Sequence, residues 1–322
     1  MSLDVLSQWL ALMPVSGRLD TRCHFGSPWR LAPGPAGQQE MPFHVLLKGE
    51  AVLELPGAAP VRLRPGDVVL LPHGSAHRLH DGSGQAAAPV QERPSVVLQV
   101  AENLAGGEAA DILCGRFVLS AFSEPMARRF LPPSLVVGSG GDAFEAKTEQ
   151  EPQRDAQRLE RLIELMRAEA EEEGPGSAAV IGHLCGALFS LVLRRASQLD
   201  AGPQSLLALA QRASLQPALM AMFTAPEKPW TLPELAALCH MSRATLIRHF
   251  ESATGQSPAE LLLQIRMARA MRHLLHTERS AGSIADDVGY QSEAAFQRAF
   301  KRHTGLTPAR FRATRALRPD PA

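Results

Sequence analysis

The stretch Met241-Ser-Arg-Ala-Thr-Leu-Ile-Arg-His-Phe250 decides the fold of the C-terminal third, because its pattern returns fifty residues later as Gln291-Ser-Glu-Ala-Ala-Phe-Gln-Arg-Ala-Phe300. Both copies place an arginine, a phenylalanine, a glycine and a proline at the same distances after their serine. Several matches at one fixed offset are typical of an internal structural repeat.

Each copy predicts a capped helix with one buried stripe. A serine can cap the helix, an apolar i,i+4 pair forms the stripe, a glycine suits the left-handed residue that ends the helix, and a proline suits the first turn of the next one. These residues are Ser242, Leu246, Phe250, Gly255 and Pro258 in the first copy, and Ser292, Phe296, Phe300, Gly305 and Pro308 in the second.

A short helix precedes each of these helices. Thr231-Leu-Pro-Glu234 has the pattern of a capping box, and Ser283 is the expected start of the equivalent helix in the second copy. A short helix, a tight turn and a second capped helix make a helix-turn-helix. One long helix from Pro258 to about Thr277 would hold the two motifs at the separation of successive major grooves.

The outward face of the second helix in each motif is where bases would be read. Arginine can pair with guanine, glutamine with adenine, and alanine or isoleucine can touch a thymine methyl group, while other basic residues meet phosphates. A single arginine is more often a solvated charge, but the repeated Arg248 and Arg298 favour contact with double-stranded operator DNA. The predicted DNA-contacting residues are Arg243, Ala244, Ile247, Arg248, Ala294, Gln297, Arg298, Lys301 and Arg302.

The charge distribution agrees with a nucleic-acid partner. The 322-residue chain has a net charge of zero, but the segment from Lys228 onward carries 14 Lys and Arg against 8 Asp and Glu. A basic segment on a neutral chain fits local contact with a polyanion.

The N-terminal third is predicted to be a β-barrel or sandwich. Short apolar runs separated by turns begin at His44, Glu50, Pro60 and Asp67, and 86–94 is expected to be a loop. The expected fold class is therefore α+β. We predict a sensor domain over 1–125, a helical connector over 126–205 and a DNA-binding domain over 206–322.

The connector contains a helix from Ser177 to about Leu199 that is apolar on most sides. Such a helix needs burial on more than one side. Packing within its own domain and association of two subunits in a homodimer both satisfy that need. The best linker candidate is 200–205, which contains Gly202-Pro203.

Four barrel residues are candidates for a metal or redox site: Cys23, His44, His77 and Cys114. Two thiols and two imidazoles can hold zinc, and Cys23 with Cys114 can alternatively act as a redox pair. The simpler reading is that buried cysteines and histidines only pack or form hydrogen bonds. Turn or surface positions suit the remaining barrel histidines, whereas Cys185 and Cys239 are expected in cores.

Several C-terminal motifs together resemble the AraC/XylS family of regulators: Arg248-x-Phe250, Gly255-x-x-Pro258, Gly289-Tyr290-x-Ser292, Phe296-x-Arg298-x-Phe300-Lys301 and Gly305-x-Thr307-Pro308. The resemblance covers about 210–315. It implies a seven-helix bundle with two helix-turn-helix motifs, usually in an activator, and RNA polymerase as a partner. Small Ala244 stands where relatives often carry a larger base-contacting residue, so no target specificity carries over.

Leu63-Arg-Pro-Gly-Asp67-Val-Val-Leu-Leu-Pro72 and Ser75-Ala-His77-Arg-Leu79 resemble a cupin signature. With Asp20-x-x-Cys23 and Cys114-Gly115, they are similar to the cupin-bearing AraC subgroup, which includes a reactive-chlorine-responsive regulator. That resemblance implies that Cys23 and Cys114 are a redox-active or metal-binding pair beside His44 and His77.

We therefore expect a transcription regulator, and no enzyme, that senses its signal in the barrel. Two alternatives stay open: a cupin metalloenzyme fused to a DNA-binding domain, and a regulator that binds a small organic effector. The four cysteines are widely spaced and no secretory signal is evident, so reduced thiols and a cytoplasmic location are expected. The longest apolar stretch, 178–193, contains His183 and predicts no membrane contact.

Overall fold

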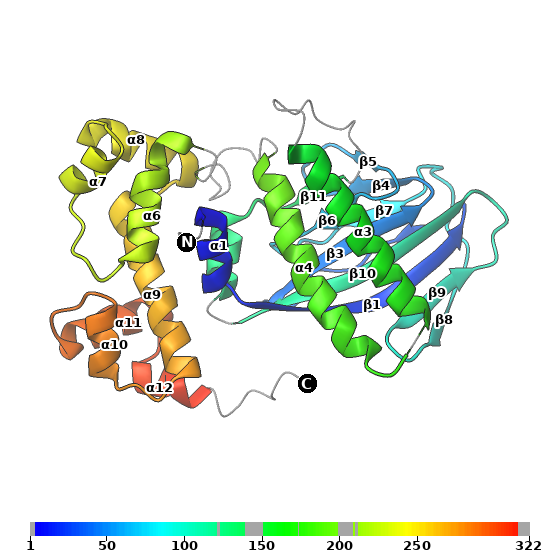
Figure 1. Ribbon diagram of the computed structural model, residues 1–322. Coiled ribbons are helices and arrows are strands. Elements are labelled where there is room, and N and C mark those ends of the chain that lie inside the picture. The colour runs from blue at the N-terminus through cyan, green and yellow to red at the C-terminus, as the bar shows by residue number, and fades with distance from the viewer. Residues whose placement is uncertain are drawn as a thin grey trace. The chain divides into compact units, whose positions relative to one another are not determined.

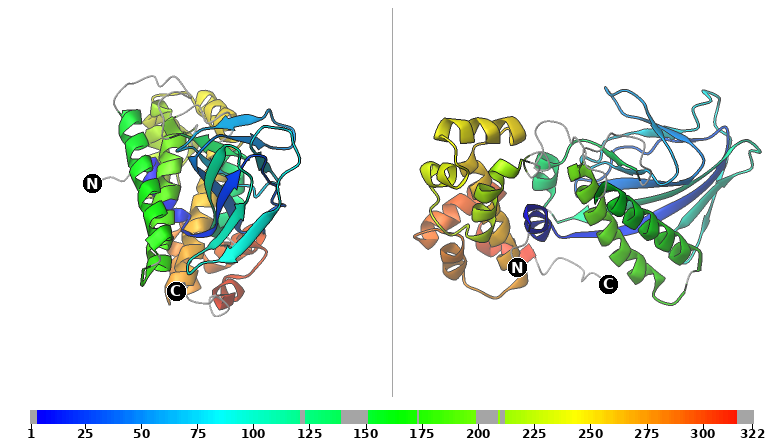
Figure 2. Two further views of the ribbon diagram at one scale, coloured as in Figure 1. Left: turned by 90° about the vertical axis from the view of Figure 1, so that its right-hand side faces the viewer. Right: turned by 45° about the horizontal axis from the view of Figure 1, so that its top comes forward.

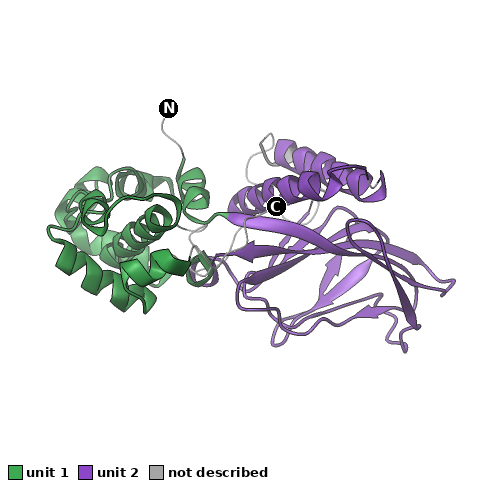
Figure 3. Cartoon of the chain, turned by 90° about the horizontal axis from the view of Figure 1, so that it is seen from below, with its two compact units in different colours: residues 1–14, 121–126, 202–322 green, residues 15–120, 127–201 purple. Residues whose placement is uncertain are grey.

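The computed structural model describes residues 4–120, 123–138, 151–172, 174–198, 209 and 212–314. The chain divides into two compact units (Figure 3). Residues 15–120 and 127–201 form one, and residues 1–14, 121–126 and 202–322 form the other. The division falls within helix α2 (Ser123–Phe130). The predicted linker 200–205 lies outside the described residues.

The first unit is built on two β-sheets. The larger has the strand order β11-β6-β3-β10-β1-β9-β8, and the smaller has the order β2-β7-β4-β5. The strands of the larger sheet are β1 (Val15–Gly26), β3 (Glu40–Lys48), β6 (Val68–Leu70), β8 (Val90–Pro94), β9 (Gln99–Asn103), β10 (Ala109–Leu119) and β11 (Leu135–Val137). Those of the smaller sheet are β2 (Arg30–Leu31), β4 (Ala51–Glu54), β5 (Val61–Leu63) and β7 (Arg78–His80).

The expected strands are present, and the expected loop over 86–94 is wrong in its second half. Strand β8 occupies Val90–Pro94 and pairs with β9 in antiparallel register. All five of its residues are exposed, so it lacks the alternation of apolar and polar residues by which a half-buried strand is recognised.

The core of this unit lies between the two sheets. Phe25 of β1, Leu53 of β4 and Ile112 of β10 all belong to it. Residues alternate between the two faces of a strand, so neighbouring positions on β10 face the other way. Phe117 illustrates this, because its ring stacks on Phe43 and also contacts Phe189, a helical residue on the outer face.

Two helices cover that outer face, α3 (Glu151–Glu172) and α4 (Ser177–Gln198). They run side by side across the larger sheet (Figures 1 and 2). Cys185, Phe189 and Val192 of α4 are buried, as expected for a core helix. The connector thus belongs to the same compact unit as the barrel rather than forming a separate one.

Helix α4 confirms the helix predicted from Ser177 to about Leu199. By length and composition alone its 22 residues could cross a membrane, although 39% of its most apolar window is already buried within the protein. Near the C-terminal end of α3, Glu171 pairs with the buried Arg22 of β1 at 2.8 Å.

The second unit is helical. Between residues 212 and 314 it contains a 3₁₀ turn (Ala213–Leu215) and seven α-helices: α6 (Gln216–Thr224), α7 (Leu232–Leu238), α8 (Arg243–Thr254), α9 (Pro258–His276), α10 (Ala281–Asp287), α11 (Glu293–Thr304) and α12 (Pro308–Ala313). The N-terminal helix α1 (Val5–Leu12) contacts α6 and α9 in this unit. Its Trp9 is buried there, although 1–125 was assigned to the sensor domain.

The predicted helix signals are confirmed with one exception. Thr231 forms the capping box, Ser242 and Ser292 cap α8 and α11, and Gly255 and Gly305 are left-handed. The exception is Ser283, which lies inside α10. The cap is Ser280, whose side chain accepts a hydrogen bond from the Ser283 amide at 3.1 Å. Both serines, three residues apart, could cap the helix, and the structure has the longer helix, which begins after Ser280.

Candidate nucleic-acid interface and sensor site

Helices α8 and α11 each turn one apolar edge to the bundle and the opposite edge to solvent. Leu246 and Phe250 of α8 are fully buried, as are Phe296 and Phe300 of α11. The nine predicted DNA-contacting residues lie off these stripes; Ile247 is partly exposed and the other eight are exposed. Capped helices with one exposed basic face are suited to the major groove.

The two repeated arginines are exposed at equivalent places. Among the residues that the structure describes, neither Arg248 nor Arg298 forms an ion pair. The last turn of α11 adds Lys301, Arg302 and His303. The guanidinium groups are therefore available to bases or phosphates without first leaving a carboxylate.

The barrel brings all four predicted sensor residues together. Cys114 of β10 lies directly opposite His44 of β3 and opposite Thr21 of β1. Cys23 is two residues beyond Thr21, so it is the diagonal neighbour of Cys114 on the same face. His77, just before β7, is 4% exposed and approaches from the smaller sheet.

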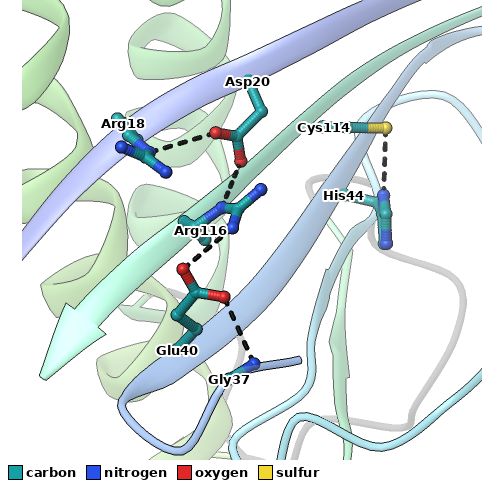
Figure 4. Close-up of polar contacts among 7 residues, drawn as sticks. All are labelled: Arg18, Asp20, Gly37, Glu40, His44, Cys114 and Arg116. Carbon is teal, nitrogen blue, oxygen red and sulfur yellow. Dashed lines mark hydrogen bonds and ion pairs between the residues drawn. The ribbon is translucent and has the colours of Figure 1, made fainter. Parts of the chain in front are cut away.

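These groups form one hydrogen-bonded chain, whose thiol–imidazole link is drawn in Figure 4. The distance is 3.1 Å from Cys114 Sγ to His44 Nδ1, and 2.7 Å from His44 Nε2 to His77 Nε2. His77 Nδ1 lies 2.9 Å from the carbonyl oxygen of Ser75. That carbonyl can only accept, so neutral His77 accepts from His44 Nε2–H, and the Cys114 thiol donates to His44.

Burial keeps these hydrogen-bonded thiol and imidazole groups uncharged. Desolvation and the neighbouring His77 lower the pKa of His44 to about 3. The hydrogen bond with Cys23, together with burial, holds the pKa of Cys114 well above its ordinary value. The imidazole and the thiol are therefore both neutral near pH 7, and the reactive thiolate is scarce.

This neutral histidine predicts acid sensitivity of the metal-free barrel. The pKa of His44 is 6.5 ordinarily and about 3 in the fold, so unfolding takes up a proton between these values. The contribution of His44 to the free energy of unfolding is therefore fully present above about pH 6.5. It falls as the pH decreases, by at most about 1.4 kcal/mol per pH unit for one histidine. Urea titrations of chelator-treated protein at several pH values measure the slope. An equal slope in a His44→Asn variant contradicts the prediction.

A cavity of about 560 Å³ opens beside these hydrogen-bonded groups and is lined by Cys23, His44 and Cys114. Its wall includes apolar residues such as Phe25 and Leu31. Volumes of this order hold small organic ligands. It therefore reaches three of the four predicted sensor residues, and the fourth, His77, lines a second cavity of about 490 Å³.

The sequence did not point to the ion-pair network that lines the same cavity. Arg116 binds Asp20 Oδ2 at 2.7 Å and Glu40 Oε1 at 2.8 Å, and Asp20 also meets Arg18 (Figure 4). These contacts raise the pKa of Arg116, and the Arg116 guanidinium lowers that of Glu40. The available signal was the spacing: Arg116 lies two residues after Cys114, on the same face of one strand.

The other barrel histidines have separate contacts. His24 lies 3.6 Å from Asp111, His73 Nε2 lies 3.1 Å from the carbonyl oxygen of Leu131, and His80 lies 3.4 Å from Glu54. Cys185 and Cys239 are buried, as expected. None of these five residues takes part in the hydrogen-bonded set formed by Cys23, Cys114, His44 and His77.

The donor set suits zinc, but its present orientation does not form a cage. Two thiols and two imidazoles are zinc ligands. In the described part of the chain, however, no three His, Cys, Asp or Glu side chains are already placed to hold a metal ion. The reason is His44, which turns one nitrogen toward Cys114 and the other toward His77, so its neighbours do not face one point.

A β-barrel with a ligand-sized cavity, joined to paired helix-turn-helix motifs with exposed basic faces, defines a DNA-binding regulator with a sensor domain. A cupin family model matches residues 4–198, and a helix-turn-helix domain model matches residues 235–314. The chain belongs to the AraC family of transcription regulators, in the group whose N-terminal domain is a cupin.

Named relatives match over nearly the whole chain. The RCS-specific HTH-type transcriptional activator RclR of Escherichia coli is 29% identical, over 96% of this chain and 97% of its own length. The HTH-type transcriptional regulator MtrA of Neisseria gonorrhoeae is 26% identical, over 96% and 98%.

Two solved structures are also similar. One is ToxT from Vibrio cholerae, at 13% identity and a TM-score of 0.35, over 94% of this chain and 98% of that one. The other is the DNA-binding domain of AdpA in complex with a target DNA, at 36% identity and a TM-score of 0.29, over 31% of this chain and 90% of that one.

Proposed function

We propose that this regulator binds operator DNA through α8 and α11 and receives its signal at the sensor chain, defined as Cys23, Cys114, His44 and His77. The observation that carries the proposal is the continuous set of contacts from the Cys23 thiol to His77, buried in the barrel beside a ligand-sized cavity. Cysteines and histidines that only filled space in the core would not need to form continuous polar contacts.

In the first form of the proposal the sensor chain binds zinc. The neutral imidazoles are ready ligands, and a cation would stabilise the thiolates that the neutral chain disfavours. Zinc binding requires His44 to turn one ring nitrogen away from its present partner. The two arrangements would then differ in metal affinity, as a switch requires.

In the second form Cys23 and Cys114 are a redox pair. Diagonal neighbours on antiparallel strands have Cα atoms about 7–8 Å apart, and a disulfide needs about 4.4–6.8 Å. Oxidation would therefore shift β1 along β10. The register irregularity between Leu19 and Thr21 is a place where β1 can take up that shift.

Metal content and thiol count, measured together on purified protein, separate these forms. For the zinc form we expect about one equivalent of zinc, lost in Cys23→Ser and Cys114→Ser and retained in the control Cys239→Ser. For the redox form we expect a mild oxidant to remove two thiols and to change reporter output only when both Cys23 and Cys114 are present.

Other outcomes contradict both forms. If the Cys23→Ser/Cys114→Ser double variant binds DNA and responds normally, the sensor chain is not the sensor. Bound iron together with substrate turnover would instead support a cupin metalloenzyme fused to the DNA-binding unit.

The cavity supports a second candidate, a small organic effector. Its apolar wall would hold the body of such a ligand, and the Asp20–Arg116–Glu40 network would meet a polar group. Effector-dependent stabilisation of the metal-free double cysteine variant would favour this candidate.

We also infer activation and homodimer formation. Activation is supported by the similarity to the Escherichia coli relative, which is a transcriptional activator, and RNA polymerase would then be a partner. Association through α3 and α4 is supported by two exposed apolar residues, Leu165 at 50% and Val180 at 40%. Sedimentation of a Leu165→Glu/Val180→Glu variant tests the interface, and an unchanged dimer contradicts it.

A further inference from the structure

The two recognition helices differ at one pair of positions. In α11, Glu293 opens the first turn and Gln297 lies one turn later on the same side. The equivalent residues of α8 are Arg243 and Ile247, fifty positions earlier in the chain. Only the second motif therefore has a carboxylate, Glu293, one turn before the glutamine that is predicted to read a base.

Glu293 and Gln297 are in direct contact. Gln297 Nε2 donates to Glu293 Oε1 at 2.8 Å. The other carboxylate oxygen lies against Gly282 of α10, where a methyl group on Gly282 would come within 3.0 Å of Glu293 Oε2. The carboxylate thus sits at the edge of the helix, between the neighbouring helix and the residue predicted to read a base.

This contact decides which way the amide faces. An ionised carboxylate only accepts hydrogen bonds, so the NH₂ end of Gln297 must face Glu293. The second N–H and the carbonyl oxygen of Gln297 remain free to contact DNA, and the contact with Glu293 fixes which side each of them occupies. Adenine presents an acceptor, N7, beside a donor, N6–H₂, whereas guanine presents two acceptors and thymine an acceptor and a methyl group.

We propose that Glu293 is a positioning residue, which orients the Gln297 amide so that it reads adenine at one position of the operator. This inference rests on α11 entering the major groove, as in the proposed function. Glu293 itself stays at the flank and contacts no base.

The test is the base preference of the full-length chain, obtained by selection from a random duplex library. In Glu293→Ala the preference for adenine at one position should fall about three- to tenfold, as expected for one lost hydrogen bond. Preferences at the other positions should stay the same. Glu293→Gln should give the same result, because an amide at 293 can donate or accept and so fixes neither orientation.

Two comparisons separate positioning from charge and from folding. Asp286→Asn removes an exposed carboxylate from α10 without touching Gln297, and it should leave the adenine preference intact. In a Gln297→Ala background the Glu293→Ala change should have no further effect on that position, since the two residues act as one unit.

Three results would overturn the inference: an unchanged motif in Glu293→Ala, an equal weakening at every position, or a further loss in the double variant. A wild-type chain that selects no motif at all contradicts the proposed DNA binding itself. A wild-type motif that Glu293→Ala leaves unchanged contradicts only the role of Glu293.

Discussion

Replacing both Arg248 and Arg298 with alanine is expected to weaken operator binding by about 2–6 kcal/mol. Each arginine is exposed near the middle of its recognition helix, and a bidentate contact with a base contributes about 1–3 kcal/mol. The two helices are separate, so the effects should add. A gel-shift titration at fixed salt measures the loss in each single variant and in the double variant.

The control removes the same charge elsewhere. Arg30 of β2 and Arg62 of β5 are exposed, outside the DNA-binding unit and away from α3 and α4. Their double alanine variant should bind as the wild type does once the salt concentration is matched. If the Arg248 and Arg298 variants also bind normally, α8 and α11 are not in the groove.

Phe300→Ala is expected to destabilise the helical unit by about 3–5 kcal/mol. Phe300 is fully buried, and its ring centroid lies 5.5 Å from that of Phe296 and 5.3 Å from that of Phe311. Truncation removes apolar contacts and leaves a cavity in the centre of the second motif. This loss is a large part of the stability of an ordinary domain. Urea titration followed by hydrogen exchange in peptides from α9–α12 measures it.

The neighbouring residue provides the control, because Lys301 is exposed on the same helix. Lys301→Ala should leave exchange in these peptides unchanged, and exchange in the barrel peptides should be unchanged in both variants. Equal stability of Phe300→Ala and Lys301→Ala would contradict the packing role of the ring.

The helical signals were predictable in detail where one residue type meets one need. Thr231, Ser242 and Ser292 cap the helices that the sequence assigned to them. The signals failed where two residues satisfied the same need, as with Ser280 and Ser283. Strand β8 was missed because it is stabilised by backbone pairing with β9, which leaves no trace in side-chain polarity.

The placement of α1 and of the predicted connector depended on contacts distant in the chain. Trp9 and Leu12 are buried in the helical unit, although the next residues begin the barrel. The apolar faces of α4 required burial, and either its own sheet or a second subunit could have provided it. The structure provides the sheet for its inner face.

The sequence by itself determined the two helix-turn-helix motifs and their basic faces. Caps, glycine ends and i,i+4 stripes all act within about one helix length, so local chemistry specifies them. Only the tertiary structure decided the sensor chain. Alternation along a strand tells which face Cys23, His44 and Cys114 occupy, but not which strands are neighbours. The pairing of β10 with both β1 and β3 sets that, and with it the contact of a thiol with an imidazole seventy residues away.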